Sequence, residues 1–282
     1  METVAIVGVG LIGGSFGLAL RKAGFRGRLI GVSSASAIRE ALERGAIDEA
    51  LPLAEAVAQA DLVYLAQPIC RILETLAALD GWLRPGSLVT DAGSTKSRIV
   101  ELGRRAIRRG QFLGGHPMAG KEKRGAGEAE ADLFAGRTYV LTPTAPEELE
   151  TAAAREFLGW IRAMGAVTVT LTPQEHDRVV ARTSHLPQML STALAVTLAS
   201  QLESAEYLRV AGPGLVDTLR LAGSSYEIWR DILATNPAEI DAALKGFIAQ
   251  LEGLRATLDS EQTESAFRTA NDFAARLKRA RG

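Results

Sequence analysis

The fold of this chain is decided near its N-terminus, where residues 3–15 read TVAIVGVGLIGGS. Five residues typical of a buried strand lead directly into the pattern G-x-G-x-x-G, and a segment with helical periodicity follows. In such a strand-turn-helix unit the first glycine permits the tight turn, the second lets the backbone approach a pyrophosphate, and the third allows close packing of helix on strand. We therefore expect the phosphates of a dinucleotide to bind at the helix N-terminus. The residues expected to hold it are Gly8, Gly10, Leu11, Ile12 and Gly13.

The composition is that of a globular protein with a real core. The chain has 282 residues, of which 47% are hydrophobic and 23% charged, enough for one large or two ordinary domains. A net charge of −1 gives no overall basic field, so we expect neither a nucleic acid nor a membrane as partner. Selective binding of an anionic metabolite would therefore depend on local arginines. The single cysteine, Cys70, excludes an intrachain disulfide and fits a reducing cytoplasm.

Strand-like runs alternate with helical segments through the first part of the chain, which predicts a Rossmann-type, doubly wound, mostly parallel sheet. After residue 171 the strand signal stops, and Thr172, Pro173 and Glu175 form a helix start signal. We therefore expect a dinucleotide-binding domain over residues 1–171 and an all-helical domain over 172–282. The strand-like runs are residues 3–7, 28–32, 62–66, 87–91, 112–115, 138–141 and 167–171.

The position that usually selects between NAD and NADP carries no acid here. An acidic side chain about 20 residues after the glycines commonly binds the adenosine ribose, but this chain has Ser33 followed by Ser34. Two serines remove the repulsion that a carboxylate would exert on a 2′-phosphate. Arg39 and Arg28 are candidates to complete a phosphate site, although Arg39 could equally be an ordinary solvated helix residue. The sequence therefore permits NADP or NAD, with NADP tolerated or slightly favoured.

Three further segments place polar side chains after strands or at a helix start. They read DAGSTK at residues 91–96, GGHPMAG at 114–120 and SHLP at 184–187. In an open α/β sheet, ligands bind in the crevice beyond the carboxyl ends of the strands. Together with the glycine fingerprint, these segments resemble the prephenate/arogenate dehydrogenase family, whose members complete the ring chemistry of tyrosine biosynthesis.

His116 is the candidate catalytic base. Oxidation of a carbinol by hydride transfer requires removal of the hydroxyl proton, and a neutral imidazole within hydrogen-bond reach of that oxygen suits the task. His116 comes at the end of an apolar strand, immediately before a loop. The resemblance implies the same role, because the family's catalytic histidine occupies this place in the motif.

The resemblance also implies roles for three other side chains. Ser94 would hydrogen-bond the substrate hydroxyl and orient the histidine, and His185 would line the substrate site from the helical domain. Arg220 would bind a substrate carboxylate, for which a guanidinium offers a permanent charge and a bidentate fork. These residues, with His116, form the predicted substrate and catalytic site.

Each of these assignments has a structural alternative. Ser94 precedes a helix and is a suitable N-cap, His185 could be a satisfied core residue, and Arg220 could pair with Asp217 at helical spacing. His176, at the start of a helix, is expected on the surface.

Residues 186–202 form a nearly uninterrupted apolar run that predicts a buried helix. The helices that follow are too few to cover it, so we expect a second copy of the chain to do so. The resemblance also implies a homodimer through C-terminal helices.

The predicted function is NAD(P)-dependent oxidative decarboxylation of a 4-hydroxycyclohexadienyl carboxylate, either prephenate or arogenate. No Cys, His or acidic cluster has metal-ligand spacing, so no metal is expected. One alternative is another Rossmann-plus-helical dehydrogenase of the β-hydroxyacid type, which would not explain the segments around His116 and His185. A second alternative is a non-catalytic dinucleotide sensor. Because the chain begins at its first strand and ends in helix, we expect neither a fused chorismate mutase nor a regulatory ACT domain.

Overall fold

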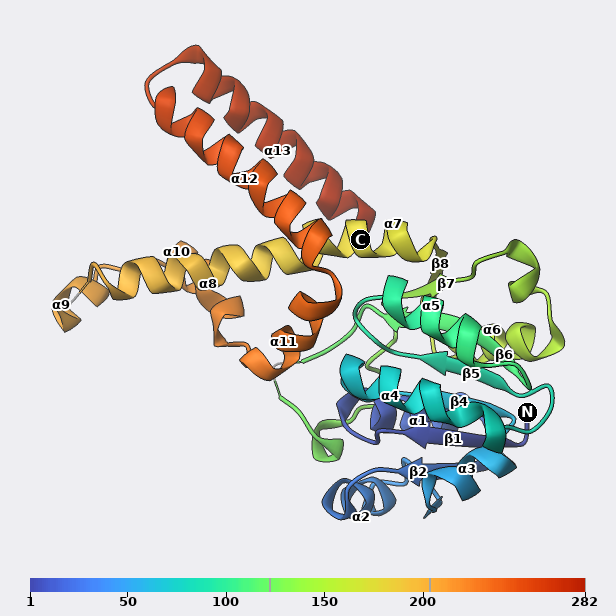
Figure 1. The fold of residues 1–282 in the computed structure, drawn as a ribbon. Coiled ribbons are helices and arrows are strands. Elements are labelled where there is room, and N and C mark those ends of the chain that lie inside the picture. The colour runs from blue at the N-terminus through green and yellow to red at the C-terminus, as the bar shows by residue number, and fades with distance from the viewer. Residues whose placement is uncertain (122, 203, 282) are drawn as a thin grey trace. The chain divides into compact units, whose positions relative to one another are not determined.

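A computed structural model describes residues 1–121, 123–202 and 204–281 (Figure 1). Its contacts divide the chain into two compact units, residues 1–237 and 238–282. The first unit contains one eight-stranded sheet. The strands are β1 (Thr3–Val7), β2 (Arg28–Val32), β3 (Glu49–Ala50), β4 (Leu62–Leu65), β5 (Leu88–Asp91), β6 (Gln111–Pro117), β7 (Thr138–Thr142) and β8 (Val167–Thr170).

The strand order is β3-β2-β1-β4-β5-β6-β7-β8, and every neighbouring pair is parallel except β6 and β7. This confirms the predicted doubly wound, mostly parallel sheet. The chain reverses direction across the sheet between β3 and β4, so a crevice opens beside β1 and β4 at their carboxyl ends. The sequence did not predict β3, because a strand of two residues is too short to show alternation.

Helices connect the strands on both faces. Those up to the last strand are α1 (Leu11–Lys22), α2 (Ala35–Glu43), α3 (Leu53–Gln59), α4 (Ile69–Leu79), α5 (Ser97–Ala106) and α6 (Ala152–Ala163). Short 3₁₀ turns are η1 (Asp80–Trp82), η2 (Ala126–Glu128) and η3 (Pro146–Leu149). After β8 the described chain is helical: α7 (Pro173–Val180), η4 (Ala181–His185), α8 (Leu186–Ala199), α9 (Ala205–Leu208), α10 (Pro213–Leu219), η5 (Arg220–Gly223), α11 (Tyr226–Thr235), α12 (Pro237–Ala256) and α13 (Glu261–Arg281).

Aromatic side chains fill the core between the sheet and the helices α1 and α6. Phe16 of α1 stacks on Tyr64 of β4 with ring centroids 3.8 Å apart, and Phe157 of α6 lies edge-on to Tyr139 of β7 at 6.1 Å. All four side chains are fully buried. Helices α4 and α5 pack against each other on the other face, as right-handed crossovers require (Figure 1).

The helical segment starts as the sequence predicted. Thr172 caps α7 by accepting a hydrogen bond from the backbone of Glu175, whose carboxylate bonds back to Thr172, and Pro173 occupies the first turn. The chain then passes through η4, which is wound as a π-helix, into α8. The wider turn of a π-helix shifts the side chains that follow it and is often found at functional sites.

Helix α8 is apolar but is not buried within its own chain, which agrees with the expectation that the helices following it are too few to cover residues 186–202. Its fully buried side chains are Gln188 and Ser191, whereas Val196 is 67% exposed. In the part of the chain that the structure describes, no helix is both long and apolar enough to cross a membrane.

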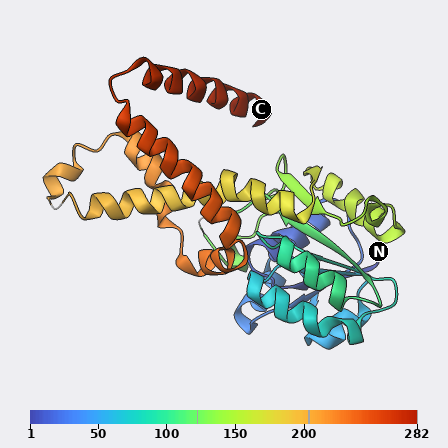
Figure 2. The ribbon, with the colours of Figure 1, turned by 45° about the horizontal axis from the view of Figure 1, so that its top comes forward.

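The second compact unit is a helical hairpin of α12 and α13. Figure 2 shows the two helices diverging from the turn that joins them. Leu251 of α12 and Phe267 and Phe273 of α13 are each at least half exposed. Apolar surface therefore remains open along both helices.

Candidate active site

The carboxyl edge of the sheet borders a cleft of about 500 Å³ within the first compact unit. Gly10, Leu11 and Ile12 line it from the loop after β1, and Ser94 lines it from the loop after β5. The loops after β4 and β6 and helix α11 form the remaining walls. Loops from four different strands thus converge on one cavity, as expected for the ligand crevice of a doubly wound sheet.

The glycine loop leaves the N-terminus of α1 open. Gly8 has a φ of +95°, and a Cβ added there would lie 2.6 Å from the carbonyl oxygen of Ala66. A Cβ on Gly13 would lie 1.9 Å from the carbonyl oxygen of Gly8, so only glycine lets α1 approach β1 this closely. Gly10 is the N-cap, where no side chain caps the helix, and a Cβ on it would meet nothing within 4 Å. Backbone N–H groups at such an end attract phosphate.

Ser33 and Ser34 follow β2 and are both exposed. Ser34 caps α2 by accepting a backbone N–H hydrogen bond at 3.4 Å. Arg39 is exposed on α2. The suggestion that Arg28 helps to bind a phosphate is wrong, because Arg28 begins β2 at the opposite edge of the sheet and its guanidinium pairs with Glu49 at 2.5 Å.

A buried ion pair holds the ends of β5 and β6 together. The carboxylate of Asp91 and the ammonium of Lys96 are both fully buried and in direct contact. Lys96 also donates to the carbonyl oxygen of Gly115 at 2.7 Å, while Asp91 accepts from the backbone N–H groups of Gly93 at 2.8 Å and Gly115 at 3.2 Å. These bonds fix the backbone on either side of the catalytic candidates.

Asp177 caps helix α5 from the helical segment. Its two carboxylate oxygens accept the backbone N–H groups of Lys96 at 2.7 Å and Ser97 at 2.8 Å, and Asn236 donates to its carbonyl oxygen at 2.9 Å. The alternative interpretation of Ser94 as the N-cap is therefore wrong. Ser94 is half-buried and lines the cleft instead.

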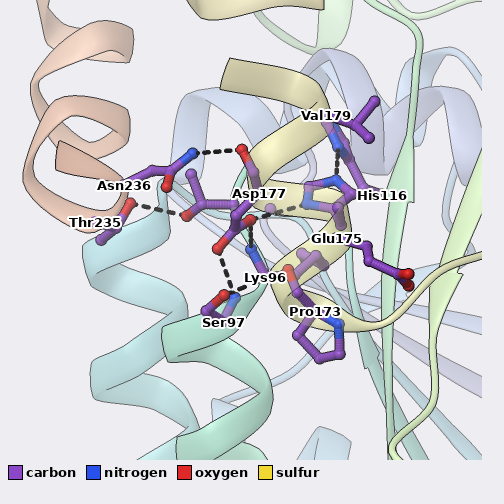
Figure 3. Close-up of polar contacts among 12 residues, drawn as sticks. Lys96, Ser97, His116, Pro173, Glu175, Asp177, Val179, Thr235 and Asn236 are labelled. Carbon is purple, nitrogen blue, oxygen red and sulfur yellow. Dashed lines mark hydrogen bonds and ion pairs between the residues drawn. The ribbon is translucent and has the colours of Figure 1, made fainter. Parts of the chain in front are cut away.

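His116 is the second-last residue of β6, where it pairs with Val140 of β7, so the strand extends further than the sequence indicated. Its side chain is half-buried. Nδ1 of His116 lies 2.8 Å from Nε2 of His176, and Nδ1 of His176 lies 2.9 Å from Oδ1 of Asp177 (Figure 3). The expectation that His176 lies on the surface is wrong, because its side chain is fully buried beneath His116.

His185 is the last residue of the π-helix, with its ring edge-on to Trp229 at 5.8 Å. It is 1% exposed, and its Nδ1 has no hydrogen-bond partner among the described residues. Such a buried, unsatisfied nitrogen is costly unless a ligand meets it. The contacts therefore do not support a satisfied core histidine.

The electrostatic environment keeps the histidines uncharged. Burial lowers the pKa of His116 well below its ordinary value, and His176, Lys96 and His185 add to this effect. Burial also lowers the pKa of His176, although Asp177 opposes the shift. The pKa of His185 falls to about 4, again mainly through burial. At neutral pH all three imidazoles are neutral and can accept a proton.

Asp177, in contrast, is ionised. Burial raises the pKa of its carboxyl, but hydrogen bonds from His176, Ser97 and Lys96 outweigh that effect, and the net pKa is lowered. A carboxylate with this many donors is strongly stabilised in its charged form.

Arg220 begins η5, which packs against α8, and its side chain is exposed. It is not among the described residues that line the cleft. The structure thus brings the glycine loop and Ser94 to one cavity and joins His116 to His176, while Arg220 lies apart on the helical segment.

Comparisons with known proteins identify the family. A sequence model described as "Prephenate dehydrogenase, nucleotide-binding domain" matches residues 16–178, and one described as "Prephenate dehydrogenase, dimerization domain" matches residues 172–272. The chain belongs to the prephenate dehydrogenase family. The resemblance drawn from residues 91–96, 114–120 and 184–187 is confirmed.

Relatives in this family match nearly the whole chain. A prephenate dehydrogenase of Bacillus subtilis is 34% identical over 96% of this chain and 75% of its own length. Among solved structures, a prephenate dehydrogenase of Aquifex aeolicus in complex with hydroxyphenyl propionate and NAD+ is 31% identical, with a TM-score of 0.87, over 99% of this chain and 98% of its own. An arogenate dehydrogenase of Synechocystis is 32% identical, with a TM-score of 0.81, over 99% of both chains.

Sequence reasoning missed His176 and Asp177 as members of the site. Both lie in the first turns of α7, where polar residues are ordinary and a surface position is the usual outcome. One signal in the sequence could have indicated that these two residues belong to the site. The His-Asp pair follows closely on the predicted domain boundary, where the helical segment must meet the carboxyl edge of the sheet. Only the folded chain shows which groups it meets there.

The buried ion pair predicts a large loss of stability when one partner is removed. Lys96→Met should lower the free energy of unfolding by about 3–5 kcal/mol, because the Asp91 charge would stay buried without its partner. Lys22→Met, which breaks an exposed pair with Asp132, should cost less than about 1 kcal/mol. Urea denaturation of both variants at equal protein concentration measures the difference. Similar losses of unfolding free energy in the two variants would mean that the buried ion pair stabilises the fold no more than an exposed one.

Proposed function

We propose that this chain catalyses the nicotinamide-dependent oxidative decarboxylation of prephenate or arogenate in tyrosine biosynthesis. The observation that carries the proposal is the position of His116: a neutral imidazole near the end of β6, whose following loop lines the same cleft as the uncapped α1 N-terminus and Ser94. The similar Aquifex aeolicus structure holds an aromatic acid and NAD+, which supports a cyclohexadienyl acid and a dinucleotide as ligands here.

The residues of the cleft fit a dinucleotide. Gly8, Gly10 and Gly13 place no side chain at the three positions of the glycine pattern, and Leu11 and Ile12 line the cleft beside them. The helix N-terminus offers unpaired backbone donors to a pyrophosphate. When bound, a nicotinamide dinucleotide supplies the acceptor for the hydride that leaves the substrate carbinol carbon.

His116 would act as the general base. It takes the hydroxyl proton from the substrate oxygen while the hydrogen on the same carbon leaves with its electron pair, and the carbinol becomes a carbonyl. Ser94, half-buried in the cleft wall, would hydrogen-bond that oxygen and align it with the imidazole. Loss of the ring carboxylate as carbon dioxide then moves the electron pair of the broken bond into the ring and leaves an aromatic phenolate, which takes up a proton to give the phenol. Aromatisation makes the reaction effectively irreversible.

His185 and Arg220 would bind the rest of the substrate. The unpartnered Nδ1 of His185 is available to a polar substrate group, and its low pKa keeps the ring uncharged. For Arg220 the support is the family motif, since a guanidinium is suited to a carboxylate. The single cysteine supports a reducing, cytoplasmic location.

A homodimer would cover the apolar surface that a single chain leaves open. Val196 of α8 and Phe267 and Phe273 of α13 are each more than 60% exposed. Residues 172–272 match the family's dimerization domain. We expect an obligate interface of about 2,000 Å² or more.

His116→Asn should abolish most turnover while preserving cofactor binding. The wild type should reduce a nicotinamide cofactor with prephenate or arogenate, and the variant should lose about 10²–10⁴-fold in kcat because it lacks a base. Since the pKa of His116 is lowered below 6.5, wild-type kcat should stay level through neutral pH and fall only in more acidic solution, as the imidazole becomes protonated. Steady-state kinetics across pH with both substrates measures this.

Arg220→Lys is the matched control for a binding defect. It should raise KM more than it lowers kcat, because a point charge replaces the two parallel hydrogen bonds of a guanidinium to the substrate carboxylate.

If His116→Asn kept kcat within about threefold of wild type, the assignment of the base would be wrong. Failure of the wild type to oxidise either substrate would contradict the proposed function.

Ser33→Asp should shift cofactor preference toward NAD. We expect the wild type to use NADP at least as well as NAD, because Ser33 and Ser34 present no negative charge to a 2′-phosphate. A carboxylate at position 33 would repel that phosphate and accept bonds from the ribose hydroxyls. The ratio of kcat/KM for the two cofactors measures the shift. Rejection of NADP by a wild type that uses NAD well would refute this interpretation.

Light scattering should give a mass of about twice the 29.9 kDa of one chain at micromolar concentration. Thermal unfolding should also depend on protein concentration, since folding and association are coupled in an obligate dimer. A monomeric mass would contradict the proposed homodimer.

A further inference from the structure

Two buried groups beside His116 take no part in the chemistry described above. His176 and Asp177 are 0% and 2% exposed, and both ring nitrogens of His176 are already occupied by hydrogen bonds to His116 and Asp177. The two residues form a continuous hydrogen-bonded chain with His116, with distances of 2.8 Å and 2.9 Å (Figure 3).

The chemistry of the three groups fixes the direction of each hydrogen bond. An ionised carboxylate only accepts, so Nδ1 of His176 must donate to Asp177. A neutral imidazole carries one ring proton, so Nε2 of His176 has none and must accept. Nδ1 of His116 therefore carries the proton of the first bond. Nε2 of His116 is left with its lone pair.

We propose that His176 and Asp177 are positioning residues that hold His116 in the Nδ1-protonated tautomer, with Nε2 as the nitrogen that receives the substrate proton. The catalytic consequence rests on the proposed function, whereas the tautomer itself is a property of the free protein. Without this chain His116 could place its single proton on Nε2, and that tautomer cannot act as a base toward the cleft.

The chain is anchored at its far end. Asp177 accepts the backbone N–H groups of Lys96 and Ser97 at the start of α5, and its backbone carbonyl accepts from Asn236. These bonds leave the carboxylate no freedom to rotate away from His176. The packing of α7 on α5 therefore holds Asp177 in place, and this in turn requires His116 to donate its hydrogen bond from Nδ1.

Nitrogen NMR of the wild-type protein tests the tautomer directly. The chain has three histidines, so protein labelled with ¹⁵N-histidine gives few signals, and long-range proton-nitrogen correlations show which ring nitrogen is protonated. We expect His116 and His176 both to be protonated at Nδ1 at neutral pH. Substituting one histidine at a time assigns each signal to its residue. Protonation of His116 at Nε2 in the wild type would overturn the proposal.

Two variants of His176 then test the effect on catalysis. His176→Phe keeps a ring of similar shape but offers no acceptor, and should lower kcat by about 10- to 100-fold, part of the ~10²–10⁴-fold supplied by a general base. His176→Gln retains an oxygen acceptor for Nδ1 of His116, and should recover much of that loss. The KM for the cofactor should stay unchanged in both.

The outcomes separate the two proposals. If both variants lose thermal stability but keep wild-type kcat, His176 is a structural residue and the positioning role is wrong. If the wild type oxidises neither prephenate nor arogenate while His116 is protonated at Nδ1, the proposed function fails and the tautomer assignment stands. If His176→Phe does not fold, the wild-type spectrum still decides.

Discussion

The carboxylate of Asp177 accepts hydrogen bonds from two directions, and the rest of the site depends on it. Toward the sheet it accepts from the backbone N–H groups at the start of α5, and within α7 it accepts from His176. A buried carboxylate is stable only with such a full set of donors. The same bonds that keep it charged also join the helical segment to the sheet and set the position of the imidazoles.

A second aspartate repeats this arrangement one helix away. Asp231 of α11 accepts the backbone N–H of Cys70 at the start of α4, at 3.0 Å. The N-termini of α4 and α5 are thus both occupied by carboxylates from the helical segment. The N-terminus of α1 has no side-chain cap, so it remains available to a phosphate. The protein's own acids therefore help to determine which helix end can receive an anionic ligand.

Charge is distributed unevenly around the cleft. Asp91 and Lys96 form a fully buried ion pair, whereas the three histidines nearby are neutral because burial opposes their protonation. The ion pair bonds to the backbone on both sides of the site and is unavailable for proton transfer. Proton acceptance is left to the imidazoles, which is the division of tasks that a dehydrogenase base requires.

The sequence by itself determined the architecture and most of the motif residues. Residues 3–15 specify a strand, an open glycine turn and a helix through local sterics, and alternating periodicity specifies a parallel sheet. The Thr172 capping box marks the start of the helical segment. The sequence could specify all three features because each depends only on residues that are neighbours in the chain. Only the tertiary structure decided that His176 is buried beside His116 and that Asp177 rather than Ser94 caps α5. Both outcomes depend on contacts between groups 60 or more residues apart in sequence, and such contacts leave no local pattern.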